Sequence, residues 1–137
     1  MTTVQFKVRL GEELHSAVKQ AAEQSNRSVN AEIVNRLELS FLQSNSQAKL
    51  VTIDRARELA AIARQQLPAM IMDKVAVEIN RSISLGHSGA YVDLNEFELE
   101  YLSDEHFEKI LEPVTSNLKA AGYTVEDLNV GSISIEF

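Results

Sequence analysis

The chain has 137 residues, of which 45% are hydrophobic, and this is enough for one or two small domains. It contains no cysteine, which excludes disulfides, thiolate metal sites and thiol nucleophiles. The N-terminal residues are polar and no apolar run is long enough to span a bilayer, so we expect a cytoplasmic protein without a membrane partner.

The net charge of −7 is unevenly distributed. Residues 1–48 contain five basic and five acidic side chains, whereas residues 49–137 contain eight basic and fifteen acidic ones. This asymmetry predicts two modules with different partners, and the acidic one is not expected to lie on DNA phosphates.

Polar and apolar side chains alternate over residues 5–10, which predicts a short strand. Gln5, Lys7 and Arg9 fall on one face of it, and their donors can reach guanine and adenine edges in a major groove. A strand this short leaves its backbone unpaired and its apolar face wet, so we expect an obligate dimer in which two copies pair. A solvated edge strand that carries charge against aggregation is the alternative reading of the same residues.

Two helices are expected next. Glu12 and Glu13 occupy the first turn of a helix that continues to Gln24, where the helix dipole favours negative charge. Asn26 suits a left-handed residue between the helices, and Ser28 is the expected N-cap of the second. The apolar residues of the strand and the helices are the expected dimer core: Phe6, Val8, Leu10, Leu14, Val18, Ile33, Val34, Leu37 and Phe41.

The segments VQFKVRL, EELHSAVKQAAEQ and NRSVNAEIVNRLELSF resemble the ribbon–helix–helix domain of Arc-type repressors, over residues 4–42. The resemblance implies that Gln5, Lys7 and Arg9 contact DNA bases. It further implies that the start of the second helix clamps the DNA backbone through Arg27, Ser28, Val29 and Asn30. It also implies a buried structural ion triad made of Arg27, Glu32 and Arg36.

Residues 44–51 are predicted to be a linker, with a frayed helix end as the alternative for the polar stretch within it. From Thr52 to Ser84 apolar residues recur with helical spacing, and Pro68 predicts either two helices or one kinked helix. A strand is expected at Ala90–Leu94. Residues 95–101 alternate in the opposite phase, so a bulge, a turn and a short helical connection all remain open.

Ser103 is the expected N-cap of a further helix that ends near Gly122, and strands are expected at residues 123–125 and 132–137. The predicted fold is therefore an N-terminal ribbon–helix–helix domain followed by a small α+β domain with a helix-covered sheet. The first domain is the βαα unit of an intertwined dimer at residues 1–43, and the second is an acidic oligomerisation or regulatory domain at residues 52–137.

The residues show no signature of an enzyme. The three histidines at positions 15, 87 and 106 lack the spacing of metal ligands. The acidic residues between Glu96 and Glu108 are better explained by a solvated face than by catalytic carboxylates. We therefore expect no catalytic residue, no metal and no cofactor.

These features predict a sequence-specific DNA-binding repressor of the phage or bacterial kind. Its partners would be double-stranded operator DNA and further copies of itself, in a dimer or a higher oligomer. The C-terminal domain would oligomerise or bind a regulatory protein or ligand. One alternative is an antitoxin whose C-terminal part binds a toxin while the N-terminal domain represses its own operon. Another is an interaction protein that uses the N-terminal fold only to dimerise.

Overall fold

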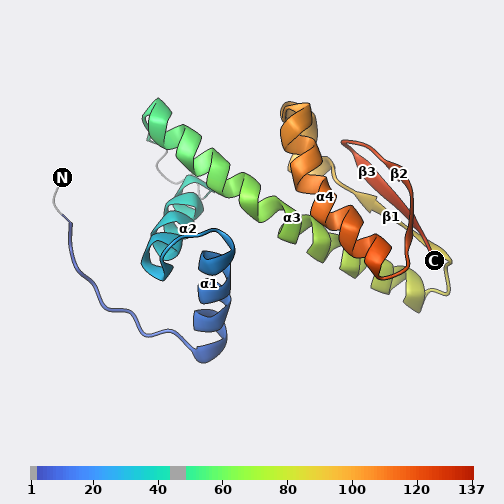
Figure 1. Ribbon diagram of the computed structural model, residues 1–137, viewed down its shortest axis with the longest axis horizontal. Coiled ribbons are helices and arrows are strands. Elements are labelled where there is room, and N and C mark those ends of the chain that lie inside the picture. The colour runs from blue at the N-terminus through green and yellow to red at the C-terminus, as the bar shows by residue number, and fades with distance from the viewer. Residues whose placement is uncertain (1–2, 44–48) are drawn as a thin grey trace. The chain divides into compact units, whose positions relative to one another are not determined.

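The computed structural model describes residues 3–43 and 49–137 (Figure 1). Residues 44–48 of the predicted linker lie outside this described part. The chain divides into two compact units, Met1–Leu59 and Ala60–Phe137, and each is considered by itself below.

The first unit is built on two helices in contact with each other, α1 (Glu12–Gln24) and α2 (Val29–Gln43). Between them Asn26 has a φ of 53°, a left-handed conformation that asparagine adopts more readily than most residues. Ser28 caps α2, because its hydroxyl oxygen accepts a hydrogen bond of 3.0 Å from the backbone N–H of Ala31. The predicted helices, the cap and the left-handed residue are confirmed.

The N-terminal segment, residues 3–10, forms neither a helix nor a strand in the single chain. Figure 1 shows it as an extended coil that leads into α1. The predicted ribbon strand needs a second chain to pair with, so the strand and the intertwined dimer stay predictions.

Helix α3 (Ile53–Ser84) continues through Pro68, so the sequence forms one helix in this stretch and not two. Its first seven residues belong to the first unit and the remainder to the second. Proline removes a single backbone hydrogen bond and crowds the preceding turn. Burial of Ile71, Val75 and Ile79 on one side of α3 opposes this cost, since packing supplies most of the stability of a helix in a protein.

The second unit contains a three-stranded antiparallel sheet of β1 (Gly89–Asp93), β2 (Thr124–Leu128) and β3 (Ser132–Glu136). The strand order is β1-β3-β2, so the last strand lies in the centre. The expected strands are confirmed to within a residue or two, apart from β2, which continues to Leu128. The connection after β1 consists of two short 3₁₀ turns, Asn95–Phe97 and Leu99–Tyr101, which selects the short helical connection among the three alternatives.

Helix α4 (Asp104–Ala120) is capped by Ser103 and is followed by Gly122 with a φ of 96°. Both ends agree with the predicted helix. One face of the sheet, α3 and α4 contribute to a single hydrophobic core, whose buried members are Ile71, Val75, Ile79, Ala90, Val92, Leu94, Leu99, Ile110, Leu111, Val114, Leu118, Ile133 and Ile135. The sheet members alternate along their strands, as expected for one covered face. The second unit is therefore an α+β fold with its own core.

Candidate nucleic-acid interface

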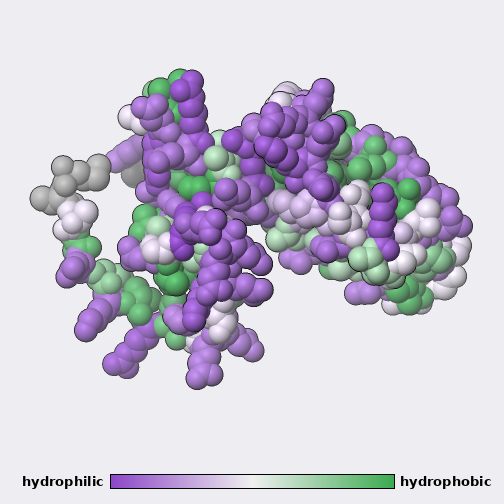
Figure 2. Space-filling model, in the orientation of Figure 1, coloured by the Kyte–Doolittle hydropathy of each residue, from purple (hydrophilic) through white to green (hydrophobic). Residues whose placement is uncertain are grey.

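The N-terminal segment presents its polar side chains to solvent. Gln5, Lys7 and Arg9 are all exposed, and they alternate with Phe6 and Val8, which are 85% and 63% exposed. Figure 2 shows hydrophobic and hydrophilic side chains alternating along this segment. The side chains predicted to contact bases are thus accessible to a DNA groove. The apolar side chains between them, however, are exposed to solvent in the single chain.

The predicted dimer-core residues of the helices are also poorly covered. Leu14, Leu37 and Phe41 are 55%, 54% and 77% exposed, and Val34 is exposed as well. Val18 and Ile33 of the helices are half-buried, and so is Leu10 of the N-terminal segment. Monomeric proteins rarely expose so many large apolar side chains on a small unit, and such surfaces mark interaction sites.

The N-terminal end of α2 has the chemistry of an anion site. Ser28 satisfies the N–H of Ala31, while the N–H groups of Val29 and Asn30 are in the first turn, where a helix offers no backbone acceptor. The positive end of the helix dipole adds to their attraction for a phosphate. Ser28 and Asn30 are exposed, so a DNA backbone could reach this turn.

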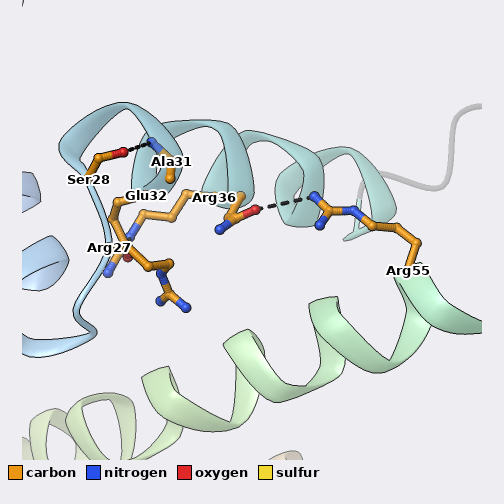
Figure 3. Close-up of polar contacts among 7 residues, drawn as sticks. Arg27, Ser28, Ala31, Glu32, Arg36 and Arg55 are labelled. Atoms are coloured by element: carbon orange, nitrogen blue, oxygen red, sulfur yellow. Dashed lines mark hydrogen bonds and ion pairs between the residues drawn. The ribbon is translucent and has the colours of Figure 1, made fainter. Parts of the chain in front are cut away.

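Glu32 is buried and lies between two arginines, Arg27 and Arg36 (Figure 3). Its Oε2 accepts a hydrogen bond of 2.8 Å from Arg27 Nε, and its Oε1 accepts one of 2.8 Å from Arg36 Nε. The Glu32 side chain is 1% exposed, against 18% for Arg27 and 47% for Arg36. A buried carboxylate with both oxygens engaged fixes the turn before α2 against the helix itself.

Burial raises the pKa of the Glu32 carboxyl, but hydrogen bonds from Arg36 and Arg27, together with their charges, outweigh that effect. The pKa of Glu32 therefore lies below its ordinary value of 4.5. Because the unfolded chain binds this proton more readily, the charged carboxylate stabilises the fold fully above about pH 4.5 and loses its effect as pH falls through the lower, folded pKa.

The folded protein should accordingly lose stability in acid through Glu32. We expect the free energy of urea unfolding to fall below about pH 4.5, and the Glu32→Gln variant to lack this part of the pH dependence. Glu13→Gln controls for the loss of one carboxylate, because Glu13 is exposed and has no ion pair within the described part of α1. The same loss of pH dependence in both variants would contradict the assignment.

A polar cluster around Arg55, near the start of α3, was not foreseen from the sequence. Arg55 donates to Glu38 Oε2 at 3.0 Å, to Asn35 Oδ1 at 3.2 Å and to Glu58 Oε2 at 2.7 Å. Figure 3 shows Arg55 reaching from α3 toward α2. Two of these partners are 17 and 20 residues away in the chain, and local periodicity carries no signal over that distance. The cluster joins the first turn of α3 to α2, at Asn35 and Glu38.

Acidic side chains of the second unit gather on solvent-exposed positions. The predicted acidic cluster is exposed throughout, as expected for a solvated face: Glu96, Glu98, Glu100, Asp104, Glu105 and Glu108. Within residues 3–43 and 49–137, no three histidine, aspartate or glutamate side chains come together as a metal site. No helix in the described part of the chain is long and apolar enough to cross a membrane.

An exposed polar segment, a helix, a left-handed turn and a capped second helix with a buried ion triad follow one another in the first unit. That order agrees with the resemblance of residues 4–42 to the ribbon–helix–helix domain. Residues 1–47 match the family described as the Arc-like DNA binding domain. Searches of the curated proteins and of the solved structures returned no match.

Proposed function

We propose that the protein is a sequence-specific transcriptional repressor that reads the major groove with a dimeric β-ribbon. The observation that carries the proposal is the Arc-like match at residues 1–47, which includes a stretch, residues 3–9, whose polar and apolar side chains are all exposed in the single chain. Pairing two copies would cover Phe6 and Val8 and align both sets of polar side chains on one face.

The chemistry of the ribbon fits base recognition. Arginine and lysine pair with the O6 and N7 atoms of guanine, and glutamine pairs with N6 and N7 of adenine. We assign Gln5, Lys7 and Arg9 to these contacts. Ser28, Val29 and Asn30 would hold the phosphate backbone at the start of α2, which fixes the register without reading sequence.

The C-terminal unit would assemble dimers on neighbouring half-sites, since one short ribbon makes few base contacts and cooperative binding compensates for that. A regulatory protein or ligand on this unit is the second candidate. The hydrophobic core of residues 60–137 favours either role over the antitoxin reading, in which a tail that folds only on its toxin would be expected. The basic side chains of Lys7 and Arg9 disfavour the alternative in which the N-terminal fold serves only for dimerisation. A non-enzymatic repressor of this kind would act in the cytoplasm of a bacterium or a phage-infected host.

Selection of bound sequences from a random duplex DNA library tests the proposal with the full chain. We expect an enriched motif that contains repeated or two-fold related half-sites, as a symmetric dimer requires. Absence of any enriched motif, with the protein folded by circular dichroism, would contradict sequence-specific binding.

Neutralising acidic side chains of the second unit should leave the salt dependence of DNA binding unchanged, because we propose that this unit lies away from the DNA phosphates. In the triple variant Glu98→Gln, Glu100→Gln, Glu108→Gln, the slope of log K against log salt should equal that of the wild type. These three side chains are exposed, so their loss should not disturb folding. A slope that becomes steeper or shallower by about 0.9, the contribution of one phosphate contact, would show that the unit lies within range of the DNA.

A further inference from the structure

Within the second unit, residues 60–137, one long face of α3 is exposed to solvent. On the covered side, Ile71, Val75 and Ile79 are 0%, 0% and 4% exposed. On the opposite side, Met70 and Val77 are 50% and 63% exposed, although both are apolar. They are separated by seven residues, two helical turns, and therefore lie on one stripe.

Charged side chains flank Val77 symmetrically on this stripe. Asp73 lies one turn before it and Arg81 one turn after it, and both are exposed. The Arg81 guanidinium is 71% exposed and is 3.8 Å from Glu78 in its own helix, which is a long, weak pair. Asp73 forms no ion pair with any residue that the structure describes. Ser84 continues the stripe, and its hydroxyl is already satisfied by a 2.9 Å bond to the Asn80 carbonyl.

We infer that this stripe is an interface between two copies of the chain, in which the α3 helices pair antiparallel about Val77. The inference deepens the assembly role in the proposed function and rests on it. In a two-fold antiparallel pair centred on Val77, Asp73 of each chain faces Arg81 of the other, and Met70 faces Ser84. In a parallel pair Asp73 would face its own copy and Arg81 its own copy, which is repulsive. Charge therefore selects the antiparallel arrangement.

The size of the stripe explains why it needs the N-terminal domain. Residues 70–84 extend over about 21 Å of helix, and one such contact buries less than the roughly 1,200–2,000 Å² of a stable, independent interface. Chains already joined through their ribbons, or bound on adjacent half-sites, meet at a high effective concentration, which makes a small contact sufficient.

Cysteine cross-linking tests the pairing cleanly, because the full chain has no cysteine of its own. At the closest approach of two helices the Cα atoms are about 4–5 Å apart, which is within reach of a disulfide. Val77→Cys should give a covalent dimer from most of the chains under mild oxidation. Ile83→Cys is the matched control, since Ile83 is 52% exposed on the same helix but away from the stripe. Cross-linking of both variants to the same extent would overturn the pairing.

Charge exchange tests the register. In the Val77→Cys background, Asp73→Arg should lower the yield of covalent dimer several-fold, because it places two arginines opposite each other. Adding Arg81→Asp should restore the yield. An equal yield of covalent dimer in all of these variants would overturn the antiparallel register. Absence of any covalent dimer from Val77→Cys would overturn the pairing, as expected if a different protein covers the stripe.

DNA binding of the same variants, measured by gel shift, separates this inference from the proposed function. Specific binding without preferential cross-linking at Val77 would overturn the pairing and leave the repressor intact. Preferential cross-linking without specific DNA binding would retain the pairing and overturn the repressor.

Discussion

Arg9→Ala is expected to weaken binding to the selected DNA site by about 1–3 kcal/mol, roughly a 5- to 150-fold rise in Kd. Arginine can donate two hydrogen bonds to one guanine, and alanine leaves those acceptors without partners in a desolvated groove. The loss should be concentrated at one base position, where the variant would accept other base pairs. Titration of the wild type and the variant against the site and its single-base changes measures both effects.

Lys19→Ala provides the control for the loss of one positive charge. Lys19 is exposed on α1, outside the predicted base-reading set. Its removal should change affinity little and alike for all sequences, since a general electrostatic effect carries no base preference. If Arg9→Ala also weakened all sequences equally, Arg9 would be a phosphate contact and the base assignment would be wrong.

The first unit was predictable from sequence where short-range rules decide the structure. Asn26 and Ser28 are separated by one residue, and each has a local reason for its place: a left-handed backbone and a side-chain cap. The ribbon strand is different, because its hydrogen-bond partners would come from another chain. A periodic pattern can predict such a strand, but one chain cannot form it.

The second unit shows where local rules are insufficient. Pro68 predicts a break or kink by its own chemistry, yet the core contacts of the following turns allow one continuous helix. Glu98 has a φ of 48° between the two 3₁₀ turns, a conformation that the sequence of alternating acids and apolar residues does not indicate. In both places tertiary packing decides among local alternatives, and a single sequence does not reveal it.

In the candidate site, too, contacts between residues close in sequence were predictable and long-range contacts were not. The pair Glu32 and Arg36 is visible in the sequence because the two residues are four apart on one helix. The contact of Arg55 with Asn35 joins residues that only the folded chain brings together. Contacts of this kind hold the start of α3 against α2, and helical spacing in the sequence does not predict them.

Glu32→Ala is expected to lower the free energy of unfolding by about 3 kcal/mol, at the lower end of the range for breaking a buried ion pair. The substitution leaves Arg27, whose side chain is only 18% exposed, without its carboxylate. Arg36 is 47% exposed and can be hydrated, which keeps the loss from being larger. Urea unfolding at one fixed protein concentration measures the difference, because the stability of a dimer depends on concentration.

Glu38→Ala is the matched control, since Glu38 also lies on α2 and pairs with an arginine, Arg55, at 2.8 Å. Its side chain is 44% exposed, and exposed pairs contribute about 0–1 kcal/mol. Equal losses in the two variants would mean that burial of Glu32 does not govern the energetics of the triad.

A third variant separates the two roles assigned to Arg27. Replacing Arg27, Glu32 and Arg36 together by apolar residues of similar volume should leave stability unchanged or higher, as is known for the triad of Arc repressor. If Arg27 also contacts a DNA phosphate, this stable variant should bind all sequences more weakly and lose about one unit of salt slope. Unchanged DNA affinity and slope would restrict the triad to a structural role, because losing a charged phosphate contact lowers both the affinity and the salt slope.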